Sequence, residues 1–357
     1  MAILPPILKG EDGRPIPLGS VLAEGGEARL VALRDDPLVL AKVFHRPALG
    51  RDDRLTCLLR HPAQEPSLLP GHRAFIWPES RLFDTQGVVV GILLPMMSGA
   101  RTLSIAIAPR LRALAWPWVD WRHLVSLGAT LAGLVARLHR QGFVLGDLKP
   151  DNILLDEAMR PSLIDCDSFL PPGWTGPDPG VASEGYAAPE NWRDQTDGHR
   201  RDQAGDRYAL AIVLGELLLG RRPGPFWDQG HPPASLLGRD VTELMTRALG
   251  PDSAGRPLAE EWRAALCTLL AGLRACANDP NHRYPDGMDC PWCKLEMQTG
   301  VRLFTSNSRK PDPWIGLRLS YERALILGDR ELAREISAAV SPNWLSLLHR
   351  QSAQCWG

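Results

Sequence analysis

The stretch that decides the fold is Leu145-Gly146-Asp147-Leu148-Lys149-Pro150-Asp151-Asn152-Ile153-Leu154-Leu155, followed by an apolar run that ends in Leu163-Ile164-Asp165. It contains an aspartate, a lysine two residues on, an asparagine five residues on, and a second aspartate behind the apolar run. Phosphoryl transfer from a metal-bound nucleotide requires these groups. Because such chemistry is mostly positioning and electrostatics, residue type and spacing carry most of the information.

Each polar residue of this stretch has an expected role. Asp147 would accept or orient the hydroxyl proton of the acceptor, and Lys149 would neutralise charge on the transferring phosphoryl group. Asn152 and Asp165 would hold the metal ions that bridge the phosphates. The competing interpretation is a polar turn between two strands, where Asp, Pro and Asn are common. Further motifs elsewhere in the chain, described below, favour the catalytic interpretation.

Composition limits the classes of protein that the chain can be. Its 357 residues allow two or three domains, and its formal net charge of -1 gives no reason to expect nucleic acid or an anionic membrane as a partner. No apolar run approaches the ~18 residues of a membrane span, and the start of the chain lacks the basic residues of a signal peptide. Seven cysteines at irregular spacing suit a reducing cytosol with a metal site. We therefore expect a cytoplasmic protein without nucleic-acid or membrane partners.

The expected secondary structure divides the chain into two halves. Residues 18–44 read as strand, glycine turn, strand, loop and strand, and residues 51–60 as a short helix. Two more strands are expected within 73–94, the first formed by 75–77 with 82–83. The spacing predicts helices at 124–138, 206–219, 240–249 and 258–273, and the second is apolar on nearly all sides. A mainly β half is thus followed by a mainly α half.

With these features the chain resembles the protein kinase superfamily over residues 18–272. The resemblance implies that Lys42 grips the α- and β-phosphates of ATP and that Asp165 begins the metal-binding D-F-G motif. It makes Tyr186-Ala187-Ala188-Pro189-Glu190 the end of the activation segment. It also makes Asp206 the residue that holds the catalytic-loop backbone, and Arg256 the partner of the glutamate in that segment. Lys42 as a surface lysine and Asp206 as a helix N-cap are the plainer alternatives.

The resemblance further implies a site for ATP with Mg²⁺ or Mn²⁺. In the family the residue after the lobe junction offers its carbonyl to adenine and the third residue its N–H, which here are Pro95 and Met97 beyond Leu94. Proline suits this position because only its carbonyl is needed. The other expected nucleotide contacts are the glycine-loop residues Gly25 and Gly26, the roof residues Val31 and Ala41 (or Leu40), and the floor residue Leu154.

The chain departs from the family pattern in several places. The three loop glycines of the family align with Ala23, Gly25 and Ala28. Leu145-Gly146 replaces the family's His-Arg, which removes the cation that awaits a phosphorylated activation loop. We therefore expect activity that does not need this phosphorylation. The D-F-G motif reads Asp165-Cys166-Asp167, which weakens the usual phenylalanine switch and leaves Asp167 to bind a second cation or to face solvent.

The helix glutamate that pairs with the strand lysine in the family has no clear counterpart. Counting back from His61-Pro62 gives Asp52 or Asp53, and Glu65 is a further candidate. Aspartate is one methylene shorter than glutamate, so a helix that used it would have to lie closer to Lys42. The sequence does not decide which of these three residues, if any, pairs with Lys42.

A second chemical cluster follows the kinase-like part. Cys290-Pro291-Trp292-Cys293 has the shape of a zinc knuckle, and Cys276 and His282 would complete a tetrahedral Cys₃His site. Thiolates and imidazole favour Zn²⁺ over Mg²⁺ or Ca²⁺. The rival interpretations are a redox C-x-x-C and free thiols, although no β-α-β frame surrounds the motif. Cys267 and Cys355 are possible substitute ligands.

These observations predict an α+β chain with a bilobal protein kinase-like fold: a β-rich N-lobe at 1–97, an α-rich C-lobe at 98–272, a zinc module at 273–300 and a helical tail at 301–357. By resemblance, the function is an ATP-dependent protein Ser/Thr kinase of bacterial type. The alternative is a pseudokinase that binds nucleotide or a partner without turnover. A kinase followed by Cys-Pro-Trp-Cys resembles a bacterial group near tellurite-resistance and stress genes. That likeness implies a von Willebrand A-type protein and a metal-dependent protein phosphatase as partners.

Overall fold

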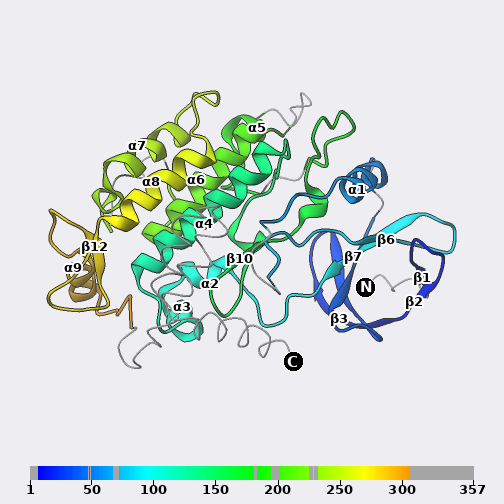
Figure 1. Ribbon diagram of the computed structural model, residues 1–357, viewed down its shortest axis with the longest axis horizontal. Helices are drawn as coiled ribbons and strands as arrows, with labels where there is room; N and C mark the ends of the chain where they lie inside the picture. The colour runs from blue at the N-terminus through cyan, green and yellow to red at the C-terminus, as the bar shows by residue number, and fades with distance from the viewer. Residues whose placement is uncertain are drawn as a thin grey trace, which may run out of the picture.

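The computed structural model describes residues 7–46, 48, 50–66, 72–180, 183–193, 201–224, 228 and 232–305. From residue 306 onward, the predicted helical tail lies outside the described residues. The described chain forms two lobes, a curled antiparallel sheet with one helix and a larger helical body (Figure 1). None of the helices among the described residues has the length and apolar character that a membrane crossing needs.

The smaller lobe is built on a seven-stranded antiparallel sheet in the order β2-β1-β6-β7-β5-β4-β3. The prediction of strands within 18–44 and a helix at 51–60 is confirmed. One face of the sheet buries Leu8 and Leu82, and the opposite face buries Leu40 against Leu55 of the helix. The elements of this lobe are β1 (Leu8–Lys9), β2 (Pro15–Ile16), β3 (Leu18–Glu24), β4 (Ala28–Leu33), β5 (Val39–Phe44), α1 (Arg51–Arg60), β6 (Ser80–Phe83) and β7 (Val89–Pro95).

The strand expected at 75–77 is wrong in its pairing. Instead of joining the sheet of the smaller lobe, Phe75 forms an isolated parallel bridge with Leu163 of the larger lobe. Ile76 N donates to Leu163 O at 2.9 Å, and Leu163 N donates to Ala74 O at 2.8 Å. The segment is apolar because it is buried where the two lobes meet, and short apolar runs of this kind do not reveal their partner.

The larger lobe is mainly helical. Its elements are β8 (Arg101–Thr102), α2 (Leu103–Ile107), α3 (Pro109–Ala115), α4 (Trp121–Arg140), the 3-10 turn η1 (Pro150–Asn152), β9 (Ile153–Leu155), β10 (Pro161–Leu163), the 3-10 turn η2 (Cys166–Ser168), α5 (Pro189–Arg193), α6 (Gln203–Leu219), η3 (Ala234–Leu237), α7 (Gly238–Leu249) and α8 (Ala259–Ala271). The helices predicted at 124–138, 206–219, 240–249 and 258–273 are therefore confirmed.

Two long helices form the core that supports the site. In α4 the predicted stripe is buried along its whole length, at Leu124, Leu127, Leu131, Leu134 and Leu138. A capping box between Asp120 and His123 begins this helix. Helix α6 begins at the N-cap Asp202, is buried on nearly every side, and ends at Gly220 in the left-handed conformation that glycine adopts freely. A helix without a polar face belongs in the middle of a domain.

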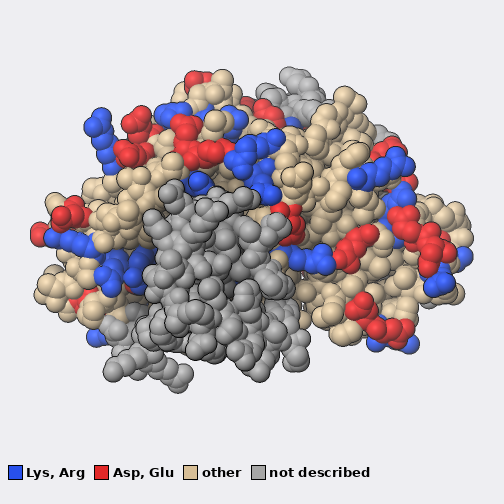
Figure 2. Space-filling view, in the orientation of Figure 1, with Lys and Arg blue, Asp and Glu red and all other residues tan. Residues whose placement is uncertain are grey.

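A small module follows α8 and packs on the end of α4. It consists of the hairpin β11 (Leu273–Ala275) with β12 (Arg283–Pro285) and of α9 (Pro291–Thr299). The ring of Trp292 lies 5.6 Å from that of Trp121 at the start of α4. On the face shown in Figure 2, the described acidic and basic side chains are interspersed, as the near-zero net charge would lead one to expect.

Candidate functional site

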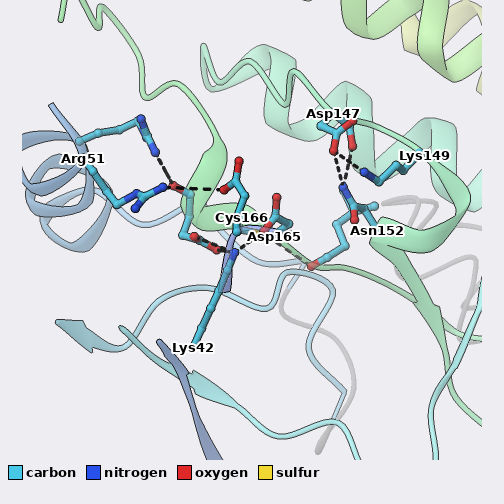
Figure 3. Close-up of polar contacts among 11 residues, drawn as sticks. Lys42, Arg51, Asp147, Lys149, Asn152, Asp165 and Cys166 are labelled. Atoms are coloured by element: carbon cyan, nitrogen blue, oxygen red, sulfur yellow. Dashed lines mark hydrogen bonds and ion pairs between the residues drawn. The ribbon is translucent and has the colours of Figure 1, made fainter. Parts of the chain in front are cut away.

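The catalytic-loop residues gather in the turn between α4 and β9. The 3-10 turn η1 begins at Pro150 and brings Asn152 back toward the loop. Asn152 Nδ2 donates to the backbone oxygen of Asp147 at 2.8 Å, and Lys149 Nζ donates to Asp147 Oδ2 at 2.7 Å. Three of the residues singled out in the sequence therefore meet in one place (Figure 3).

The two carboxylate oxygens of Asp147 have different surroundings. Oδ2 accepts from Lys149 and from Asn152 Nδ2, the latter at 3.2 Å. Oδ1 is buried and has no hydrogen-bond partner among the described residues. Leaving a buried acceptor unsatisfied costs about 1–3 kcal/mol, so proteins seldom keep one without a reason. A carboxylate held at one oxygen and unpaired at the other can accept the proton of a hydroxyl that reaches it.

The backbone of this loop is anchored from below by Asp206 of α6. Its carboxylate accepts from the amides of Leu145 at 2.8 Å and Gly146 at 2.7 Å, and it lies 3.0 Å from His139 Nε2. The side chain is only 1 % exposed. The expectation that Asp206 holds the catalytic-loop backbone is confirmed, and the interpretation as a helix N-cap is wrong because Asp202 caps α6.

Across the site, Lys42 of β5 forms an ion pair with Asp165 (Figure 3). It forms a second ion pair with Asp167. Asp165 has φ 61 and ψ 27, a left-handed backbone that non-glycine residues seldom adopt and that is found at functional sites. Burial lowers the pKa of Lys42, but the charges of Asp167 and Asp165 outweigh it and raise the pKa above its usual value. Lys42 therefore carries its positive charge, and the interpretation as a surface lysine is wrong.

None of the candidate acids counted from the sequence pairs with Lys42 in the part of the chain that is described. Asp52 accepts from Arg81 at 2.7 Å, and Asp53 points to solvent. Glu65 accepts from the backbone amide of Ala74 at 2.9 Å. The partners of Lys42 are Asp165 and Asp167 instead. Asp167 is buried, so the expectation that it faces solvent is also wrong.

A cation does lie beside the catalytic loop, although the sequence pattern indicated none. Arg201, just before α6, lies against Gly146, which has φ +78; a Cβ there would lie 2.3 Å from Arg201 Nη1. Arg201 Nε donates to Asp178 Oδ1 at 2.6 Å, and Nη2 donates to the backbone oxygen of Ser168 at 3.0 Å. This arginine comes from another segment, and an activation-segment aspartate already neutralises it. Activity that does not need activation-loop phosphorylation therefore stays a prediction.

Two contacts hold the end of the activation segment. Arg256 Nη2 donates to Glu190 Oε2 at 2.9 Å, which confirms the predicted pair. Lys149 Nζ also donates to Ser183 Oγ at 2.7 Å, a contact that sequence reasoning missed. The signal that could have found Ser183 is its place three residues before Tyr186, which begins the Y-A-A-P-E segment.

The roof predicted for the nucleotide must be revised. Lys42 pairs with Leu30 across the sheet, whereas Ala41 pairs with Val31. Because neighbouring residues of a strand point to opposite faces, Val31 and Ala41 lie on the face away from Lys42, where they pack with Leu8 and Leu82. The apolar side chains on the Lys42 face include Leu30 and the alternative named earlier, Leu40.

The remaining predicted nucleotide contacts lie near this face. Leu94 pairs with Leu40 and so shares its side of the sheet, Pro95 ends β7, and Met97 packs on the same cluster. Leu154 is half-buried in β9. Gly25 and Gly26 form the turn between β3 and β4, and both would accommodate a Cβ without a close contact. The local fold does not require these glycines, so their role in approaching a phosphate stays a prediction.

The predicted metal ligands of the small module converge. The ligand atoms of Cys276, His282, Cys290 and Cys293 all lie within 4.8 Å of one another. Cys276 Sγ is 3.6 Å from Cys293 Sγ, and His282 Nδ1 is 3.4 Å from Cys293 Sγ and 3.6 Å from Cys290 Sγ. With zinc–sulfur bonds of ~2.3 Å, a tetrahedral site places its sulfurs ~3.8 Å apart. The cluster therefore fits Zn²⁺, and Glu296 Oε1, 3.2 Å from His282 Nε2, could orient the imidazole.

Comparison with known proteins points to one fold. No protein-family model matches the chain. The sequence is 26% identical over 328 residues to the protein kinase YegI of Escherichia coli K12, which covers 80% of this chain and 50% of that protein. It is 31% identical over 171 residues to the serine/threonine-protein kinase PkaA of Streptomyces coelicolor, covering 43% of this chain and 30% of PkaA. The chain thus spans about half the length of YegI.

Solved structures agree on the fold. A rhoptry kinase from Toxoplasma gondii superimposes with a TM-score of 0.54 at 20% identity, covering 74% of this chain and 83% of that one. ROP2 from the same organism, described as having a protein-kinase fold and no enzymatic activity, gives 0.51 at 18% identity, covering 74% and 86%. The chain has the protein kinase fold, and its sequence is similar to protein kinases over most of its length.

Proposed function

We propose that the chain is an ATP-dependent protein kinase that transfers the γ-phosphoryl group to a serine or threonine hydroxyl of a protein. The observation that carries the proposal is Asp147, with Oδ2 held by Lys149 and Oδ1 buried and unpaired. A general base needs this combination of fixed orientation and an unpaired acceptor. The similarity to named serine/threonine kinases supports the choice of acceptor.

The residues divide the reaction between them. The acceptor oxygen attacks the γ-phosphorus as Asp147 takes its proton, and the bond from that phosphorus to the ADP oxygen breaks. Lys149 neutralises charge on the transferring group, and Lys42 positions the phosphates. Asn152 and Asp165 offer the oxygen ligands that Mg²⁺ or Mn²⁺ prefers. The metal supplies neutralisation of the developing charge.

We also propose that the cluster of Cys276, His282, Cys290 and Cys293 holds a structural Zn²⁺. These four residues would fill all the ligand positions of a tetrahedral ion, which is typical of structural rather than catalytic zinc. A cytoplasmic setting is proposed from the seven irregularly spaced cysteines, which suit a reducing compartment. Stress signalling and partners of the von Willebrand A and metal-dependent phosphatase types rest on the Cys-Pro-Trp-Cys resemblance. Mass spectrometry of phosphosites after incubation with candidate partners would test the proposed partners.

The decisive experiment measures transfer of labelled phosphate from ATP to serine- and threonine-containing peptides and to the chain itself. Asp147→Asn keeps the shape of the side chain and removes the base, so we expect a loss of about 10²–10⁴-fold. Asp151→Asn is the matched control, because Asp151 is exposed and hydrogen-bonds Ser104. Transfer that survives Asp147→Asn would show that another enzyme in the preparation produced it.

A nucleotide-binding pseudokinase is the second candidate. Lys42 already forms ion pairs with two carboxylates, those of Asp165 and Asp167. ROP2, a protein of the same fold, is described as having no enzymatic activity. Calorimetric titration with ATP and Mg²⁺ separates the candidates when it is run beside the transfer assay. Binding without transfer to any peptide or to the chain itself would favour the pseudokinase.

A further inference from the structure

Helix α1 presents a cation to the site where the family resemblance implies an acid. Arg54 is 4 % exposed and lies in the first turns of α1, between the exposed Asp53 and the buried Leu55. Its Nε and Nη2 donate to the backbone oxygen of Asp167 at 3.4 and 3.3 Å. Burial lowers the pKa of Arg54 to about 10, so the guanidinium is charged at neutral pH.

Lys42 needs a permanent negative partner for two reasons. It is only 8 % exposed, and a buried ammonium without a counter-charge is strongly destabilised by the loss of its hydration. Its second neighbour, Asp165, is also the residue proposed to bind the nucleotide metal. A carboxylate that ligates a metal cannot at the same time be the sole support of the lysine.

Asp167 supplies this support. It is 5 % exposed, and its Oδ1 and Oδ2 lie 2.8 and 2.9 Å from Lys42 Nζ. The 3-10 turn η2 carries Asp165 at its N-cap and Asp167 inside it, so two carboxylates two residues apart reach one ammonium.

We propose that Asp167 is the positioning residue for Lys42, having taken over the task of the missing helix acid, and that Arg54 ties this relocated pair to helix α1. The inference rests on the proposed function, in which Lys42 positions the phosphates. The position of α1 thus affects Lys42 through the backbone carbonyl and the carboxylate of Asp167. No direct ion pair between the helix and the lysine is needed.

The proposal predicts that the ion pair can be moved back to the helix. Asp167→Asn removes the charge with little change of shape, and we expect kcat/KM for ATP to fall by about 100-fold, the loss that misplacing a reacting group by ~1 Å can cause. The double variant R54E/D167G places a glutamate on α1 and the family's glycine after Cys166. It should exceed the matched control R54Q/D167G by about 10-fold in kcat/KM.

Each result has a defined meaning. Circular dichroism confirms that every variant is folded, and Asp52→Asn on the exposed side of α1 should keep the wild-type kcat/KM. Equal activity of folded R54E/D167G and R54Q/D167G, or wild-type kcat/KM in D167N, would overturn the proposal, since a merely structural aspartate would change stability alone.

Affinity for ATP with Mg²⁺ is measured for the same variants. If the wild type binds ATP without turnover, the proposed function fails. Asp167 is still supported as the positioning residue of Lys42 if the affinities of the variants for ATP follow the order expected for kcat/KM. A wild type that does not bind ATP overturns both.

Discussion

Replacing Asp206 tests the architecture beneath the catalytic loop. The carboxylate accepts from two backbone amides and lies within hydrogen-bonding distance of His139. Hydrogen bonds to a charged acceptor contribute about 1.5–3 kcal/mol each, which would sum to about 5–9 kcal/mol if they were additive. Relaxation and water entry reduce this sum, and breaking a buried charged pair costs about 3–5 kcal/mol. We therefore expect Asp206→Ala to lower the free energy of unfolding by about 4 kcal/mol.

The measurement is equilibrium unfolding in urea together with hydrogen exchange of single amides. The amides of Leu145 and Gly146 should lose their protection in Asp206→Ala, because the oxygens that accept from them are gone. Asp206→Asn keeps one acceptor oxygen and serves as a milder variant in case the alanine variant does not fold. The matched control is Asp202→Ala, which removes the N-cap bond to Gly205 of the same helix and should cost about 1 kcal/mol.

The reasoning would be refuted if Asp206→Ala and Asp202→Ala cost the same free energy and left the two loop amides equally protected. That result would mean that packing around α6, rather than the buried carboxylate, holds the catalytic loop. A fall in stability with unchanged exchange at Leu145 and Gly146 would refute the specific role in the same way.

Three further predictions follow from particular contacts. Asp178→Asn should lower phosphoryl transfer about 10-fold, because Arg201 loses the charge that orders the activation segment; unchanged transfer would contradict this reasoning. Protein purified without added metal should carry one zinc per chain by elemental analysis, and Cys293→Ser should lose both the zinc and part of the thermal stability. Burial lowers the pKa of His72 to about 4 from about 6.5 unfolded, so the unfolded chain binds more protons between these values. Stability should therefore fall by up to about 3 kcal/mol as the pH drops from 6.5 to 4, and this part should vanish from urea midpoints of His72→Gln.

Much of the site was predictable because its parts are neighbours in the sequence. Asp147, Lys149 and Asn152 lie within one turn of chain, so their spacing alone places them together. Long-range pairs such as Glu190 with Arg256 were also found, because family resemblance supplied both partners. The prediction that Ala41 contacts the nucleotide could have been rejected from the sequence. Ala41 and Lys42 are adjacent in one strand, so their side chains point to opposite faces of the sheet.

The sequence by itself determined the β-then-α order, the buried helices and the catalytic loop, because periodicity and local spacing are properties of contiguous residues. Only the tertiary structure decided which charged partners Lys42 and Arg201 have. Lys42 and Asp167 are 125 positions apart, and Arg201 reaches Gly146 from a different segment. From the sequence alone, several acidic residues could have paired with Lys42, and several arginines could have lain beside Gly146. The choice among them depends on which side chains the packing of helix, sheet and activation segment buries together, because a buried charge is stable only beside its counter-charge.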